Sequence, residues 1–406
     1  MTVPAPTDAG DRDLETPVAQ RNLYDFDLAG LEAELTGLGW KAFRARQLFK
    51  WLYHEGVTDF AAMTNLSVAH RDYLAEHYCV ALPEAATRQL SADGTRKWRM
   101  RLPSGELVET VLIPEGDRRT LCVSSQVGCV LNCSFCATGK QGFNGNLDTS
   151  QIVGQVLIAN AELAAAGDTR RVTNVVLMGM GEPLLNFDAV IRAVNVMTED
   201  LALGLAKRRV TISTAGVVPA IYKMAQCTEV ALAISLHAPT DELRSQLVPL
   251  NKKYNIESLI DACRNYVDVL GERRSITIEY TLMRGVNDAP EHAHALAKVL
   301  RDLRCKINLI PFNPFPGSGY ERPSGNSVRR FQGILQAASY TTVCRATRGD
   351  DIDAACGQLV GQVVDRTRRQ QRYKERLDQQ GQNGHSGVGL GTDATQQIPV
   401  KEVADR

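Results

Sequence analysis

Three cysteines lie close together in the sequence, where Cys129, Cys133 and Cys136 form a Cys-x3-Cys-x2-Cys pattern. Thiolates at such spacings converge on one centre and hold zinc or an iron–sulfur cluster. A structural zinc site closes with four protein ligands, and no His or fourth Cys lies just downstream of Cys136. Three thiolates around a cubane of four irons leave one iron for a non-protein ligand. The triplet favours a [4Fe-4S] cluster over its alternatives, a zinc knuckle with a distant ligand or three unrelated buried thiols.

A second motif, Met178-Gly-Met-Gly181-Glu182-Pro183, directly follows a predicted strand. Glycines let a backbone approach a ligand closely, and the carboxylate of Glu182 can bind an amino group. An ordinary strand-to-helix turn would use the same Gly and Pro residues, so the motif alone leaves both interpretations open.

Polar residues also follow three later strands. Taken singly, each is better explained as a helix cap or a turn residue, and a lone His is as well explained as a satisfied core side chain. Because the carboxyl ends of parallel strands meet at one edge of a sheet, together they outline one mouth. These residues are Ser213, the run Ser235-Leu236-His237, and Asn313.

Two further cysteines stand apart from the triplet. Cys122 ends a predicted strand seven residues before Cys129. Cys356, in RGDDIDAACGQL, is predicted on the first turns of a helix that Asp350 or Asp351 would open. A helix N-terminus favours the reactive thiolate form. From the residues alone, inert buried thiols remain the stronger interpretation of both.

Helices and strands alternate after the triplet, which indicates βα crossovers and a parallel sheet. Periodicity does not distinguish a barrel from a doubly wound sheet. The predicted helices span residues 150–166, 187–198, 217–224, 256–270, 289–303 and 328–338, and the predicted strands 172–178, 209–213, 230–235, 275–282, 306–310 and 341–345.

The part before the triplet is predicted to contain three helices within residues 28–78, followed by strands within 87–125. One helix, residues 43–53, carries Lys41, Arg44, Arg46 and Lys50 at or near its start and among its aromatic residues. Such a helix can contact RNA phosphates, although a solvated charged face is the commoner case. Within the strand VETVLI, alternation places Glu109 on the solvent side.

The chain has 406 residues, 44% hydrophobic, and zero formal net charge, so any nucleic-acid contact must come from local patches. Neither a signal peptide nor an apolar run long enough for a membrane span is present, so we expect a cytoplasmic protein with reduced cysteines. The expected parts are a disordered tail (1–20), a helical accessory RNA-binding domain (21–86), an α/β core with an N-terminal β extension (87–364), and a basic helix end with a disordered tail (365–406).

The triplet, with Phe135 before its last cysteine, resembles the radical S-adenosylmethionine (SAM) superfamily. Longer stretches resemble the RlmN family of dual-specificity RNA methyltransferases over residues 28–364. They include KAFRARQLFKWLY, CVSSQVGCVLNCSFCATG, NVVLMGMGEPL, AISLHAPTDELRSQLVP, NLIPFNPFPGSGYERPS and RGDDIDAACGQL.

This resemblance implies a partial (β/α)6 radical SAM barrel with a small helical N-terminal domain and a short β extension. It implies methylation of adenine carbon 2 in 23S rRNA, at the peptidyl-transferase centre, and in tRNA next to the anticodon. Two SAM molecules would be used per turnover. Cys356 would carry the methyl group, Cys122 would form a transient disulfide with it, and Glu109 would accept a proton. The SAM contacts implied are Gly181, Glu182, Ser213, Ser235, Leu236, His237 and Asn313, and the cluster ligands are Cys129, Cys133 and Cys136.

The implied partners are 23S rRNA, tRNA and a low-potential electron donor such as flavodoxin. No membrane is implied, and nothing in the sequence indicates an oligomer, so we expect a monomer. Three alternatives remain at this point. A Cfr-like enzyme would methylate carbon 8 of the same adenine, a glycyl-radical activase would need no Cys122/Cys356 pair, and a zinc-stabilised RNA-binding protein would be no enzyme.

Overall fold

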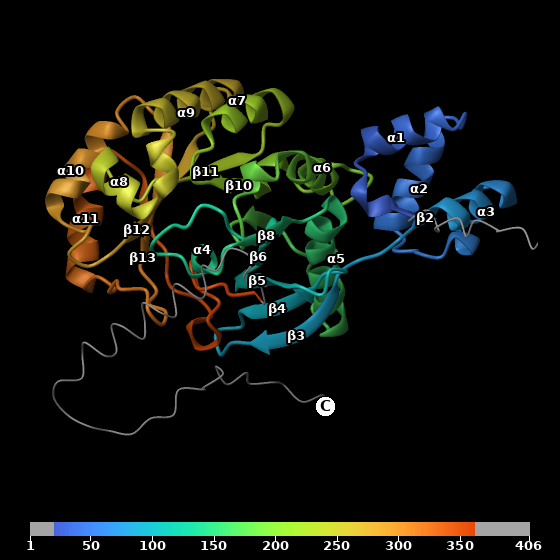
Figure 1. The fold of residues 1–406 in the computed structure, drawn as a ribbon, viewed down its shortest axis with the longest axis horizontal. Coiled ribbons are helices and arrows are strands. Elements are labelled where there is room, and N and C mark those ends of the chain that lie inside the picture. Colours follow the sequence, from blue (N-terminus) through green and yellow to red (C-terminus); the bar gives the residue numbers. More distant parts are fainter. Residues whose placement is uncertain (1–19, 362–406) are drawn as a thin grey trace, which may run out of the picture.

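The computed structural model describes residues 20–361 of the chain. A small helical unit lies beside one end of a larger α/β unit (Figure 1). The small unit contains α1 (Leu28–Gly37), α2 (Phe43–Tyr53) and α3 (Val68–His77), and a short parallel pair, β1 (Arg21–Asn22) with β2 (Tyr78–Cys79), closes it. The side chains of Asp27 and Ser67 cap α1 and α3.

The β extension consists of four antiparallel strands: β3 (Glu84–Leu90), β4 (Arg96–Arg101), β5 (Leu107–Glu115) and β6 (Arg118–Cys122). The prediction for Glu109 is wrong, because its side chain is only 1% exposed. Strand β5 is covered on both faces. Thr110 donates to Gln155 of helix α5 (Thr149–Ala165), while Glu109 contacts the C-terminal segment through Val360.

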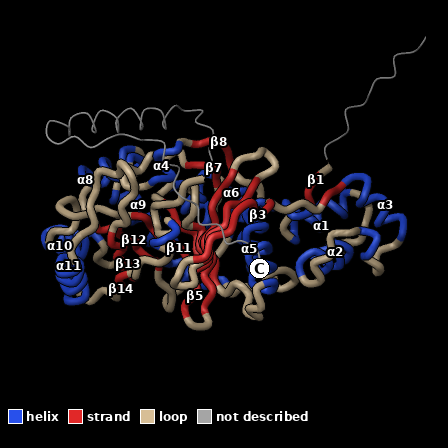
Figure 2. Tube along the Cα trace, turned by 90° about the horizontal axis from the view of Figure 1, so that it is seen from below, coloured by secondary structure: helices blue, strands red, loops and turns tan. Residues whose placement is uncertain are grey.

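These four strands form one end of a ten-stranded sheet with the order β14-β13-β12-β11-β10-β9-β6-β5-β4-β3. The strands from β6 to β14 in this order are parallel to one another. Helices pack outside this curved sheet, which gives the open barrel predicted by resemblance (Figures 1 and 2). The strands are β9 (Asn174–Leu177), β10 (Val210–Thr214), β11 (Ala231–Ser235), β12 (Ile276–Leu282), β13 (Cys305–Pro311) and β14 (Thr342–Cys344). The helices that connect them after α5 are α6 (Phe187–Thr198), α7 (Val218–Cys227), α9 (Ile256–Leu270), α10 (Pro290–Val299) and α11 (Gly325–Ala337).

Short elements that the sequence did not predict surround the cysteine triplet. Strands β7 (Gln126–Gly128) and β8 (Phe143–Asn146) pair on either side of it, and helix α4 (Ala137–Gln141) begins directly after Cys136. Helix α8 (Asp241–Leu247) follows β11.

Among residues 20–361, no helix combines the length and the apolar character needed to cross a membrane.

The predicted helix around Cys356 is wrong for the described residues. Only a single 3-10 turn forms, over Asp350–Ile352, and Asp353 then adopts a left-handed conformation with φ 49°. The chain continues as a loop to Gly361. Its backbone carbonyls accept hydrogen bonds from α4, and not from N–H groups four residues further along the same segment, as they would in a helix. Gly357 O accepts from the N–H of Ala137, and Gly361 O accepts from the side chain of Gln141. The remainder of the predicted basic helix lies outside the described residues.

Candidate active site

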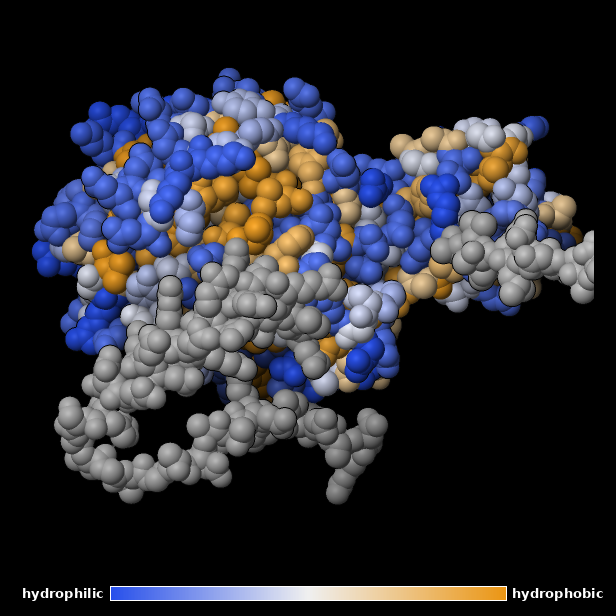
Figure 3. Space-filling model, viewed as in Figure 1, coloured by the Kyte–Doolittle hydropathy of each residue, from blue (hydrophilic) through white to orange (hydrophobic). Residues whose placement is uncertain are grey.

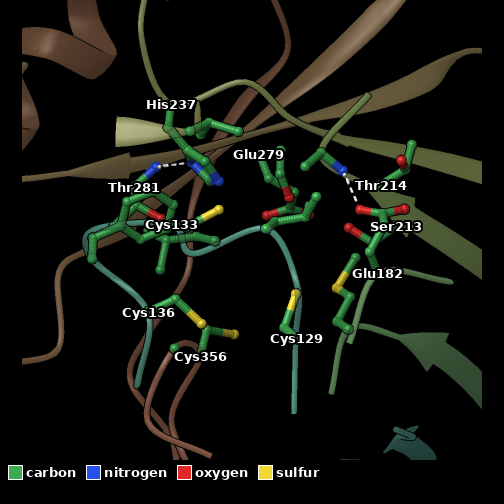
Figure 4. Close-up of a pocket in the computed structure, with 18 of the residues that line it drawn as sticks. Cys129, Cys133, Cys136, Glu182, Ser213, Thr214, His237, Glu279, Thr281 and Cys356 are labelled. Atoms are coloured by element: carbon green, nitrogen blue, oxygen red, sulfur yellow. Dashed lines mark hydrogen bonds between the residues drawn. The ribbon is translucent and has the colours of Figure 1, made fainter. Parts of the chain in front are cut away.

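A cavity of about 160 Å³ opens at the carboxyl ends of the parallel strands, and all three triplet cysteines line it (Figure 4). Hydrophobic residues gather at the centre of this face of the larger unit, within a hydrophilic surround (Figure 3). Among residues 20–361, no three His, Cys, Asp or Glu side chains come close enough to share a single metal ion. The cavity thus lies at the carboxyl ends of the parallel strands, where the sequence predicts the site.

The loop that carries the triplet is shaped by close backbone contacts. Gly128 has φ 74°, and a Cβ there would lie 1.9 Å from Gly142 O, so only glycine fits. Burial raises the pKa of the thiols of Cys133 and Cys136. A cationic centre would be needed to hold these thiols as thiolates. Three soft sulfur donors lining one cavity fit an iron–sulfur cluster, which Cys129, Cys133 and Cys136 would hold.

Glu182 lies at the turn after β9 and is 3% exposed. Its Oε2 accepts a hydrogen bond of 2.8 Å from the N–H of Ala215 (Figure 4). Its Oε1 accepts one of 3.1 Å from the N–H of Leu184. Burial raises the pKa of this carboxyl, and these hydrogen bonds oppose that effect. Gly181, at φ 104°, packs so closely on Gln126 that a Cβ would lie 2.5 Å from its Cβ. The carboxylate is therefore held rigidly at the cavity wall.

His237 also lines the cavity, together with Ser213 and Ser235. Its Nδ1 accepts a hydrogen bond of 3.0 Å from the N–H of Thr281, which leaves the ring proton on Nε2 (Figure 4). Burial, and after it the charge of Arg244, lowers the pKa of His237 to about 3. The residue is thus a neutral imidazole that belongs to both the core and the cavity wall.

Leu236 and Asn313 are placed differently from the other predicted SAM contacts, because neither lines the cavity. The side chain of Leu236 is fully buried in the core, and its carbonyl accepts a hydrogen bond from Arg244. Asn313 is 4% exposed and directs its Nδ2 toward Cys356 O at 3.5 Å. Its contact is therefore with the loop that carries Cys356.

Cys356 lines the cavity beside the triplet, and Figure 4 shows its sulfur next to Cys136. The Nη1 of Arg345 lies 4.0 Å from the sulfur of Cys356. Cys122, at the end of β6, is half-buried and does not line the cavity. Burial raises its pKa to about 12, the Cys356 thiol adds to this increase, and the charge of Arg345 opposes it.

Sequence reasoning missed three charged residues here, because isolated charges in strands and helices usually lie on the surface. Arg345 follows β14 directly. Glu279, 3% exposed on β12, lines the cavity, accepts from Asn308 through Oε1, and has no hydrogen-bond partner at Oε2. Arg244 is fully buried and donates to the carbonyls of Ala215 and Leu236. The only sequence feature that could have identified them is that each lies on or next to an element near the predicted site at the carboxyl ends of the strands.

Glu109 lies away from the cavity, on the face of β5 toward the loop of Cys356. Its Oε2 accepts a hydrogen bond of 2.9 Å from the N–H of Val360. Its Oε1 lies 3.2 Å from Arg99 Nε and 3.6 Å from Lys97 Nζ. The structure therefore brings Glu109 to the Cys356 loop but not to the cavity wall.

Comparison with known proteins identifies the family of this chain. The family model described as the ribosomal RNA large subunit methyltransferase N-terminal domain matches residues 21–80, and the family model of the radical SAM superfamily matches residues 123–297. The dual-specificity RNA methyltransferase RlmN of Pseudomonas entomophila is 56% identical over 362 residues, which cover 89% of this chain and 96% of that protein. The chain belongs to the RlmN family.

Other comparisons agree with membership of the RlmN family. The dual-specificity RNA methyltransferase RlmN of Pseudomonas putida (strain W619) is also 56% identical, and the match covers 89% of this chain and 95% of that protein. The crystal structure of a radical SAM methyltransferase from Sphaerobacter thermophilus is 45% identical with a TM-score of 0.76, and the match covers 84% of this chain and 99% of that one. The chain is therefore a radical SAM enzyme that methylates RNA.

Proposed function

We propose that this RlmN-family enzyme methylates carbon 2 of adenine, both in 23S rRNA at the peptidyl-transferase centre and in tRNA next to the anticodon. The main support for this proposal is the position of Cys356. Its thiol lines the same cavity as Cys129, Cys133 and Cys136, yet it comes from a loop at the other end of the chain. The sulfur of Cys356 therefore faces the proposed cluster site but is not one of the three proposed cluster ligands. This position is suitable for a residue that carries the transferred methyl group.

The cluster and SAM, when bound together, supply one-electron chemistry that can activate an unreactive methyl carbon. Cys129, Cys133 and Cys136 would hold the cluster. The rigid carboxylate of Glu182 suits the amino group of SAM, and Ser213, Ser235 and His237 complete the wall around the rest of SAM. These residues orient the cofactor, and the apolar part of the cavity limits the access of water.

Two cysteines divide the transfer between them. Cys356 accepts a methyl group from one SAM and holds it at the cavity, and activation of that methyl group consumes a second SAM. Once this carbon is joined to carbon 2 and the base has lost its carbon-2 hydrogen, the Cys122 thiolate attacks the sulfur of Cys356. The disulfide bond forms as the bond from that sulfur to the carbon breaks, and the released carbon takes up a proton to become the methyl group of the product. The influence of the Cys356 thiol on the pKa of Cys122 supports this pairing, because it requires the two groups to lie near one another.

The helical unit is the proposed RNA-contacting domain. On and beside α2, Lys41 and Lys50 are exposed, whereas Arg46 pairs with Glu32 and Arg44 donates to Asn65 O. The two exposed lysines are therefore the better candidates for phosphate contacts. We further propose a low-potential donor such as flavodoxin, a cytoplasmic location and a monomer.

Two cysteine variants test the proposal. Cys356→Ala should form no methylated RNA but should still cleave SAM. Cys122→Ala should instead accumulate a covalent protein–RNA adduct, detected as an RNase-sensitive mass shift in denaturing electrophoresis. Loss of SAM cleavage in Cys356→Ala, or free unmodified RNA with Cys122→Ala, would contradict the assigned roles. Carbon-8 methylation by the wild type would support a Cfr-like reaction with the same cysteines.

A further inference from the structure

A buried ion pair lies between two strands of the β extension. Lys97 on β4 is 4% exposed and Glu109 on β5 is 1% exposed, and Nζ lies 3.6 Å from Oε1. Arg99, which is partly exposed, adds a second cation at 3.2 Å from the same oxygen. Burying a lysine is costly unless its charge is paired and its hydrogen bonds are satisfied. The pair therefore needs an explanation beyond the packing of the sheet.

Each member of this pair holds one side of the Cys356 loop. The Nζ of Lys97 donates to Asp353 O at 3.2 Å, three residues before Cys356. The Oε2 of Glu109 accepts from the N–H of Val360 at 2.9 Å, four residues after it. One connected unit, from Asp353 through Lys97 and Glu109 to Val360, thus joins the two ends of the loop.

The loop depends on such contacts because it has no regular structure of its own. Residues 353–361 form neither helix nor strand in the structure, so their backbone groups must find partners elsewhere. Hydrogen bonds to charged groups are roughly twice as strong as neutral ones, and they are the kind supplied by Lys97 and Glu109. On the opposite side, Ala137 and Thr138 of α4 hold Gly357 O and Leu359 O.

We propose that Lys97 is a positioning residue for Cys356, which it holds at the cavity by joining the Glu109 carboxylate to the loop backbone. This inference rests on the proposed function for its purpose, since it assumes that Cys356 is the methyl carrier. It also gives Glu109 a loop-anchoring role, because both of its carboxylate oxygens are engaged.

Hydrogen–deuterium exchange on the full-length, cluster-loaded protein tests the anchor directly. Lys97→Met removes the charge and shortens the side chain by one heavy atom, while Lys97→Arg keeps the charge. Arg101→Gln is the matched control, since Arg101 lies on the same strand and forms only an exposed ion pair with Glu84. Exchange in peptides that cover residues 353–361 should accelerate about tenfold or more in Lys97→Met, as expected for the loss of a charge-assisted hydrogen bond. It should stay near the wild-type rate in Lys97→Arg and Arg101→Gln.

Two results would overturn the anchor. One is an unchanged exchange rate in the loop of Lys97→Met. The other is an acceleration of the same size in β11, which would mean that the ion pair supports the whole fold and does not act on this loop in particular.

A second readout separates this inference from the proposed function. The fraction of Cys356 that carries an S-methyl group in the purified protein is measured by peptide mass spectrometry. Lys97→Met should lower that fraction several-fold relative to Arg101→Gln. If the wild type forms no S-methyl Cys356 when supplied with SAM, the proposed function fails, and the exchange experiment still decides whether Lys97 anchors the loop.

Discussion

The guanidinium of Arg345 lies beside the sulfur of Cys356, with 4.0 Å between Nη1 and Sγ. Arg345 also lines the cavity, and Nη1 is 4.0 Å from the sulfur of Met178. The pKa of Arg345 is raised chiefly by the Cys356 thiol and also by Glu279 and Cys122. A fixed positive charge thus stands next to the proposed methyl carrier.

Removal of this charge should slow methyl transfer to Cys356, because the contact between the guanidinium and the sulfur helps to hold Cys356 at the cavity. We expect Arg345→Leu to lower the single-turnover rate of Cys356 S-methylation about tenfold or more, and Arg345→Lys to retain part of that rate. Peptide mass spectrometry over a time course measures it. Arg304→Leu, which loses an ion pair with Asp268 and hydrogen bonds to the carbonyls of Gly271 and Val267, is the control. Equal rates in Arg345→Leu and Arg304→Leu would show that the charge has no such role.

The triplet cysteines are predicted to hold iron. Cys133→Ala, reconstituted with iron and sulfide without oxygen, should bind far less than the four irons of a wild-type cluster and should lose the brown absorbance. Cys227→Ala removes an exposed free thiol elsewhere and should keep the wild-type content. Iron and sulfide analysis of both variants decides the point, and a full cluster in Cys133→Ala would remove Cys133 from the ligand set.

Arg244 should contribute strongly to stability. Its guanidinium donates to the carbonyls of Leu236, Ala215 and Ser235 and to Asn251 Oδ1, and it is fully buried. Arg244→Met would remove these buried hydrogen bonds, each at a cost of about 1–3 kcal/mol. We expect the free energy of unfolding of the metal-free protein in urea to fall by about 3 kcal/mol or more.

The exposed Arg264, which pairs with Asp261 three residues away, offers the comparison for Arg244. Arg264→Met should change the free energy of unfolding by about 0.5 kcal/mol or less. A similar loss in both variants would mean that the buried hydrogen bonds of Arg244 contribute nothing special.

Acid should loosen the contact between Asp93 and Gly349, the residue directly before the 3-10 turn that leads into the Cys356 loop. Burial acts to raise the pKa of Asp93, but hydrogen bonds from Thr95 and from the N–H of Gly349 lower it from 3.8 to about 2. The folded pKa lies below the unfolded value, so the stabilisation is complete above pH 3.8 and is lost as the pH falls toward 2. In the metal-free protein, stability should fall more between pH 4 and 2 in the wild type than in Asp93→Asn. Equal slopes would contradict the assignment.

The sequence predicted the parts of the site that depend on local patterns. The alternation of helices and strands placed Glu182, Ser213, Ser235 and His237 after parallel strands, and the parallel sheet brings them to one cavity. The fold class and the RlmN family are confirmed. The catalytic and cofactor roles of individual residues stay predictions.

Features that depend on distant contacts were not predictable. The Cys356 loop forms no helix because α4 and β5, more than 200 residues away in the chain, take up its backbone groups. Glu109 is buried because that same loop covers its face of β5. An alternating pattern describes only one strand and does not show which segment will cover it.

The identity of the methylated base is the most direct test of carbon-2 methylation by this enzyme. The cluster-loaded enzyme is incubated without oxygen with SAM, a reductant and a 23S rRNA transcript, and the digested nucleosides are analysed by mass spectrometry against standards. We expect 2-methyladenosine with the wild type and none with Cys356→Ala. Formation of 8-methyladenosine, or SAM cleavage by the wild type without any methyladenosine, would contradict it.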